Sequence, residues 1–151
     1  MNLKRIQATL FFGLVGISFL SYAQTLESMD AKQLQQLLIN KTLTSIPVDN
    51  LNGKDIANTF SFVFDGHGHA LGKLAIKPQG EPQIDKGHYE IKEDGTVYLT
   101  WQHWDGAKQL CAHFFDTQNA YLAIDCSNVF HTVFMKTAIK PGNAILGAVD
   151  N

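Results

Sequence analysis

Histidine and aspartate gather most densely in one short segment, Asp65-Gly66-His67-Gly68-His69. His67 and His69 stand at alternate positions, and two imidazoles with the Asp65 carboxylate are ligands that zinc or copper accepts. Glycine and aspartate are also what a hairpin turn requires, and exposed histidines suit a solvated loop. The segment therefore leaves two interpretations open: a metal site built from His67, His69 and Asp65, or a turn without a metal.

His113 is a second candidate for chemistry, as an acid or base inside the fold. An inward imidazole near Trp101 and Tyr89 could move a proton in a small enzyme. That role needs an inward carboxylate to orient the ring, and none is evident from the sequence. We therefore favour a hydrogen-bonded interior histidine and predict no catalytic residue.

Aromatic residues form a third group. Phe60, Phe62 and Phe64 alternate along one expected strand, so their rings share a face. Such rings would either line an apolar ligand pocket or fill the interior. The predicted lining set is Phe60, Phe62, Phe64, Tyr89, Trp101, His113 and Phe115, with Phe134 beside it. Tyr98 and Trp104, together with Phe114 in the favoured register, are expected to face outward, where exposed aromatic residues can mark a partner surface.

Motifs and charge exclude several classes of function. The chain contains no nucleophile elbow, phosphate loop, HExxH pair or dinucleotide fingerprint. Hydrolase, kinase and dehydrogenase chemistry therefore has no support, and we predict no cofactor. The formal net charge of −2 and the lack of a basic stripe argue against nucleic acid as a partner. The predicted partner is a small apolar ligand or another protein.

The segment that must position these residues is 87–126, which predicts four strands joined by three tight turns. In its first turn, Gly95 can take the positive φ that a tight hairpin needs. A loop of residues 93–95 then places every large apolar side chain of both strands on one face. This register pairs Ile91 with Val97, Tyr89 with Leu99 and Gly87 with Trp101.

The two cysteines, Cys111 and Cys126, lie in the last hairpin of that segment. If residues 117–120 form its loop, the cysteines stand directly across from each other, within reach of a disulfide. Two cysteines without CxxC spacing in an exported chain also indicate a disulfide. His113 and Phe115 share the face of Cys111, which we expect to be interior; the alternative register keeps His113 outside.

A short helix is predicted before the strands, at about residues 30–40. Asp30 and Gln33 can form a capping box, and the leucines that follow share one face, which would cover one end of the fold. Further strands are expected at 42–46, 59–64, 69–76 and 130–139, with a polar loop at 49–58. Short links without helices require antiparallel pairing. The predicted fold is mainly β, a single antiparallel up-and-down barrel of about eight strands preceded by one short α-helix.

The N-terminus has the features of a secretory signal peptide. Lys4 and Arg5 precede an apolar run at 8–20, and small residues at positions 21 and 23 precede Gln24. The apolar run is short for a membrane span, although an uncleaved anchor is the alternative. We predict a signal peptide at 1–23 and a single barrel domain at 24–151, exported and without stable membrane insertion after cleavage.

The hairpin from Gly87 to Thr96, followed by Trp101 and Cys111, resembles a family of small exported proteobacterial proteins of unknown function. That family has lipocalin-like or avidin-like barrels and a G-x-W-x-I-x-x-D-G hairpin; this chain carries Tyr89 at the tryptophan position. The family's N-x-T-L-T start is matched at residues 40–44. The resemblance implies a barrel in the periplasm or secreted from a Gram-negative bacterium, and it brings no catalytic residues.

These observations predict an exported, non-enzymatic barrel that binds a small apolar ligand or a protein partner. Two alternatives stay open: a metal-binding protein that uses His67 and His69, and a small barrel enzyme with His113 as its acid or base.

Overall fold

The computed structural model describes residues 26–46, 59–75, 81–128 and 131–146. The predicted signal peptide and the predicted loop at 49–58 lie outside these residues. The helices are α1 (Ala31–Leu38), η1 (Trp104–Ala107) and η2 (Lys136–Ala138). The strands are β1 (Lys41–Thr44), β2 (Thr59–Phe64), β3 (His69–Ala75), β4 (Gln83–Ile91), β5 (Thr96–Trp101), β6 (Gln109–Asp116), β7 (Ala120–Asp125), β8 (His131–Met135) and β9 (Lys140–Pro141). The mainly β prediction is confirmed.

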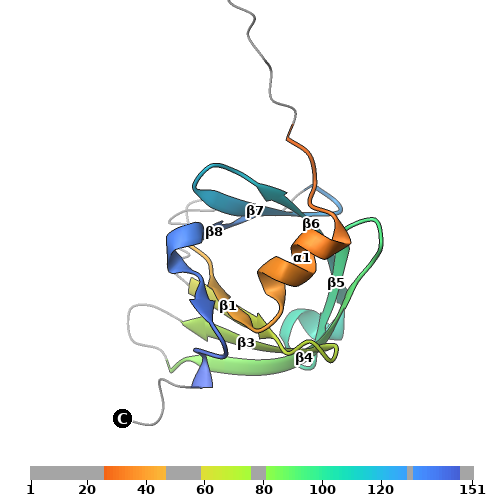
Figure 1. Ribbon diagram of the computed structural model, residues 1–151. Helices are drawn as coiled ribbons and strands as arrows, with labels where there is room; N and C mark the ends of the chain where they lie inside the picture. The colour runs from red at the N-terminus through yellow and green to blue at the C-terminus, as the bar shows by residue number, and fades with distance from the viewer. Residues whose placement is uncertain (1–25, 47–58, 76–80, 129–130, 147–151) are drawn as a thin grey trace, which may run out of the picture.

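The strands form one antiparallel sheet in which β1 to β8 pair in sequence order. The sheet curls until its two ends meet, and Figure 1 shows the strands as a ring. At the meeting point Ser45 bridges Phe134, and the Ile46 amide donates to the Val133 carbonyl at 2.9 Å. The up-and-down barrel expected from short links between strands is therefore the observed architecture.

The predicted continuous last strand at 130–139 is wrong, because the chain leaves the sheet after β8. Continuing the Ser45–Phe134 pairing would place Thr42 opposite Thr137, but Thr42 pairs with Lys140. The three extra residues are taken up by the short helix η2. A bulge of this kind is a usual way to adjust register where a barrel closes.

The hairpin of β4 and β5 has the predicted register. Gly87 pairs with Trp101, Tyr89 with Leu99 and Ile91 with Val97. The turn is closed by the Lys92 amide, which donates to the Thr96 carbonyl at 2.9 Å.

Gly95 in this turn has a second role besides its φ of 82°. The backbone of Met29 packs against it so closely that a Cβ would overlap the Met29 carbonyl oxygen. We expect Gly95→Ala to lower the free energy of unfolding by more than about 2 kcal/mol, measured by urea denaturation, because it combines backbone strain with this overlap. Gly106→Ala is the control, since Gly106 has a φ of 64° and open space around it. Equal losses in both variants would contradict the packing argument.

Helix α1 covers one end of the barrel. Asp30 and Gln33 form the predicted capping box, with hydrogen bonds of 2.8 and 2.9 Å. Leu34, Leu37 and Leu38 are buried in the same core cluster as Phe64 of the barrel wall. Figure 1 shows the helix lying within the outline of the ring. Within the described ranges, no helix is long and apolar enough to cross a membrane.

Candidate functional site

A row of aromatic side chains runs through the barrel. Phe64 lies next to α1, because the Asn40 amide that follows the helix donates to its carbonyl. Its ring stacks on Tyr89 with centroids 3.9 Å apart, and the row continues through Phe62 to Phe60 at 5.0 and 5.7 Å. Phe60 then meets Trp101 at 5.9 Å. Five of the predicted lining residues are therefore brought together: Phe60, Phe62, Phe64, Tyr89 and Trp101.

Trp101 lies at the end of the barrel away from α1, which we call the far end and define by Phe60, Asp85 and Trp101. Two glycines on neighbouring strands make room for its indole. A Cβ at Gly72 would lie 2.7 Å from the ring, and one at Gly87 would lie 2.9 Å from it. Trp101 is 2% exposed. The glycines therefore allow a large side chain to lie flat against the barrel wall.

Trp104 belongs to the same cluster, and the expectation that it faces outward is wrong. Its ring lies 5.0 Å from Trp101 and 6.0 Å from Phe60. The next three residues, Asp105, Gly106 and Ala107, all have φ values between 55° and 64°. This left-handed stretch turns the chain back after β5, so that Trp104 packs inward.

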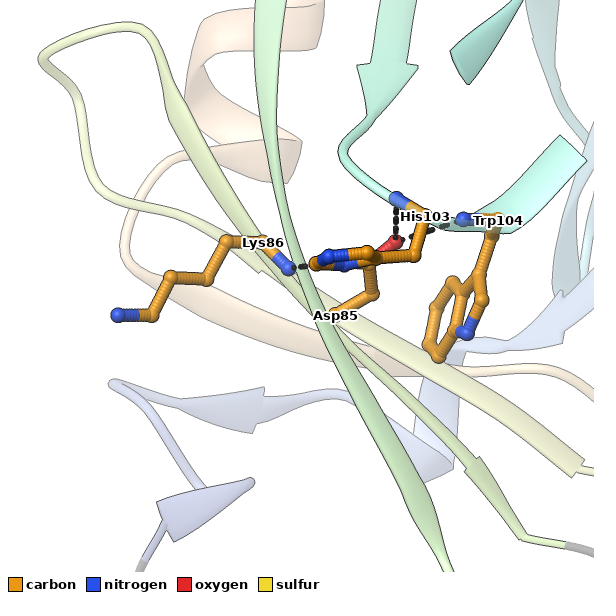
Figure 2. A network of polar contacts seen from close by, with 4 residues as sticks. All are labelled: Asp85, Lys86, His103 and Trp104. Atoms are coloured by element: carbon orange, nitrogen blue, oxygen red, sulfur yellow. Dashed lines mark hydrogen bonds and ion pairs between the residues drawn. The ribbon is translucent and has the colours of Figure 1, made fainter. Parts of the chain in front are cut away.

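Asp85 holds this turn in place (Figure 2). One carboxylate oxygen accepts hydrogen bonds from the backbone amides of His103 and Trp104, both at 2.8 Å. The other oxygen accepts the Lys86 amide at 2.8 Å and lies 2.9 Å from Nδ1 of His103. The Asp85 side chain is 1% exposed. One buried carboxylate thus joins the start of β4 to the connection between β5 and β6.

The charge of Asp85 is stabilised by these partners. Burial alone would raise the pKa of its carboxyl, but the hydrogen bonds from His103, Trp104 and Lys86 lower the pKa to about 2. Asp85 is not among the site residues predicted from the sequence. The signal was present, since Asp85 alternates with Gly87 and Tyr89 along β4 and so faces inward.

His103 lies at the rim of the far end, with its side chain 80% exposed. Its Nδ1 points to Asp85, so the Nε2 atom is the one available to a ligand or solvent. A carboxylate that orients an imidazole is a common arrangement in binding and catalytic sites, but here the same carboxylate also fixes three backbone amides. These contacts show that Asp85 supports the rim of the far end.

The expected inward placement of His113 and Phe115 on β6 is wrong. The inward residue is Phe114, which is buried and stacks on Phe134 at 6.3 Å. Alternation then puts His113 and Phe115 on the outer face. The expectation that Phe114 faces outward is wrong for the same reason. His113 therefore cannot act on a molecule inside the barrel.

The predicted disulfide between Cys111 and Cys126 is confirmed. The two residues face each other across β6 and the end of β7 with Cα atoms 5.5 Å apart. The Cys126 amide donates to the Cys111 carbonyl at 3.0 Å. His113 lies beside this bond on the outer face, with Nε2 3.9 Å from the Cys126 sulfur.

The wall opposite the aromatic row carries smaller side chains towards the far end. Phe114 and its alternate neighbours Ala112 and Leu110 share the inward face of β6, and Ala123 on β7 pairs with Phe114. Leu110, nearest the far end, is 38% exposed. At the α1 end the inward residues Leu34, Leu38 and Phe64 are 1% exposed or less. The inward side chains at the α1 end are thus buried, whereas at the far end Trp101 is buried and Leu110 is partly exposed.

The predicted metal ligands lie in the β2–β3 turn, outside the barrel. Asp65 and His69 are in contact, with Oδ2 and Nδ1 2.8 Å apart, and Asp65 also accepts the His67 and His69 amides. Burial opposes the charge of Asp65, but these hydrogen bonds lower its pKa to about 2. Across the described residues, no group of three or more His, Cys, Asp or Glu side chains is arranged to hold a metal. A site built from His67, His69 and Asp65 stays a prediction.

Comparison with protein-family models, curated protein sequences and solved structures finds no match to this chain. The resemblance to small exported proteobacterial barrels therefore stays a prediction.

Proposed function

We propose that this protein is an exported, non-enzymatic barrel that binds a small apolar ligand at its far end. The observation that carries the proposal is the difference between the two ends. Apolar side chains pack tightly under α1, whereas Leu110 faces inward and is 38% exposed at the far end. An inward apolar side chain in contact with solvent is what the mouth of a ligand site offers.

The composition of the two walls supports an apolar and flat ligand. Phe60, Trp101 and Trp104 provide aromatic rings on one side, and Leu110 and Ala112 provide small apolar groups on the other. Rings and methyl groups favour burial of apolar surface and aromatic stacking over hydrogen bonding. The disulfide, together with the signal peptide predicted from the sequence, supports an oxidising compartment outside the cytoplasm.

A protein partner is less well supported. Of the three aromatic residues expected on the outer surface, Trp104 and Phe114 pack inside the barrel. Tyr98 remains on the outer face, where it pairs across the ladder with Cys111. Tyr98 and the outward Phe115 are both only half-buried, and scattered aromatic residues of this kind are ordinary on a protein surface and mark no interface.

The proposal is tested by filling the far end. We expect Ala112→Phe to weaken binding of the fluorescent probe 1-anilinonaphthalene-8-sulfonate at least about tenfold, because the new ring occupies the ligand volume. Binding is followed as energy transfer from Trp101 and Trp104, the only two tryptophans of the chain. Leu122→Phe is the matched control, since Leu122 pairs with Phe115 on the outer face. Equal affinity in wild type and Ala112→Phe, with both folded by circular dichroism, would contradict the proposal.

A further inference from the structure

A groove of about 390 Å³ lies on the outer face of the sheet, and histidines from two strands line it. His69 at the start of β3 and His88 on β4 are direct partners in the ladder. Their rings lie side by side, with centroids 5.4 Å apart and planes inclined by 57°. His88 was not among the metal ligands predicted from the sequence, because it is 19 positions from His69.

We propose that His69 and His88 form a binding site for a divalent transition-metal ion, with Asp65 orienting His69. The separation of the rings fits a shared ion. A metal–nitrogen bond of about 2.1 Å places each ring centre about 3.2 Å from the ion, so two ligands at a tetrahedral angle have centres about 5 Å apart. The observed 5.4 Å is close to that value.

Asp65 supplies the second part of the site. Its Oδ2 lies 2.8 Å from Nδ1 of His69, which leaves Nε2 of that ring as the ligand atom. A carboxylate that holds the other nitrogen of a metal-binding histidine fixes the ring and increases its basicity. The carboxylate is itself fixed by the His67 and His69 amides at 2.7 and 3.0 Å. The turn therefore orients His69 before an ion arrives.

The site is accessible and open. The His69 side chain is 60% exposed, and the remaining coordination positions are available to water. Two imidazoles and water are a ligand set that copper(II) binds more tightly than zinc. This site is separate from the far end of the barrel, so it does not depend on the proposed function.

The test is calorimetric titration of the mature protein with Cu²⁺. We expect one ion per chain, and we expect His69→Ala and His88→Ala each to weaken binding at least about tenfold. His67→Ala is the matched control, because His67 is an exposed histidine of the same turn that contributes its amide to Asp65. It should leave the affinity unchanged.

Two outcomes would overturn the proposal. Loss of binding in His67→Ala with retention in His88→Ala would place the ion in the turn, and unchanged binding in all three variants would place it elsewhere. Zn²⁺ provides a second readout by nuclear magnetic resonance. The ring protons of His69 and His88 should shift together in a saturable manner while those of His67 stay in place, and shifts at His67 alone would contradict the assignment.

Discussion

Replacing Asp85 with asparagine is expected to lower the free energy of unfolding by about 3 kcal/mol, as measured by urea denaturation. The carboxylate accepts three backbone amides and faces the His103 ring, and its side chain is 1% exposed. An asparagine would point an amide N–H₂ group at two of these donors, and buried donors without acceptors are costly. Trp104 should also loosen, which would shift tryptophan emission to longer wavelength before global unfolding.

Asp65→Asn is the matched control. Asp65 also accepts two amides and contacts a histidine in a turn, but its side chain is 44% exposed. Water can replace lost partners there, so we expect a smaller loss and unchanged tryptophan emission. An Asp85→Asn protein as stable as the wild type would show that the network in Figure 2 does not hold the rim.

The same carboxyl predicts how stability depends on pH. Its pKa is about 2 in the folded protein and 3.8 as the ordinary value, so the unfolded chain binds the proton more readily. The stabilisation is therefore fully present above about pH 4 and is lost as the pH falls through about 2. The difference corresponds to about 2 kcal/mol. Asp85→Asn should flatten the wild-type decline in stability across this range.

Removing the disulfide is expected to have an effect of similar size. Cys111 and Cys126 are 15 residues apart in the chain, and a loop of that length contributes about 3 kcal/mol in the chain-entropy model. The Cys111→Ala, Cys126→Ala variant should melt about 10 °C lower by differential scanning calorimetry. Its near-ultraviolet circular dichroism should stay native, because the β6–β7 ladder continues on both sides of the bond. A variant with an unchanged melting temperature would contradict the prediction.

The parts of the fold that the sequence predicts are those decided by local chemistry. The register of β4 and β5 follows from the Asp94–Gly95 turn and from strict alternation of apolar residues on both sides. The capping box at Asp30 and Gln33 is set within four residues. The disulfide partner follows from the length of a single loop. In each case a register error would turn apolar side chains to the solvent or separate the partners.

The parts that the sequence does not predict depend on distant contacts. Residues 110–115 are nearly all apolar, so alternation does not identify the inward face of β6. That face is decided by packing of Phe114 on Phe134, which is 20 positions away. The inward turn of Trp104 depends on three consecutive left-handed residues, of which one is glycine. The role of Asp85 depends on backbone amides 18 and 19 positions further along the chain.

Native mass spectrometry of protein purified from the cells that naturally produce it would show whether a ligand occupies the far end. Wild type and Ala112→Phe would be prepared in parallel and measured before and after denaturation. We expect an apolar molecule that leaves the wild type on denaturation and that is missing from Ala112→Phe. The same extra mass on both proteins would contradict a ligand site at the far end. A wild type that carries no extra mass and also fails to bind the fluorescent probe would contradict it as well.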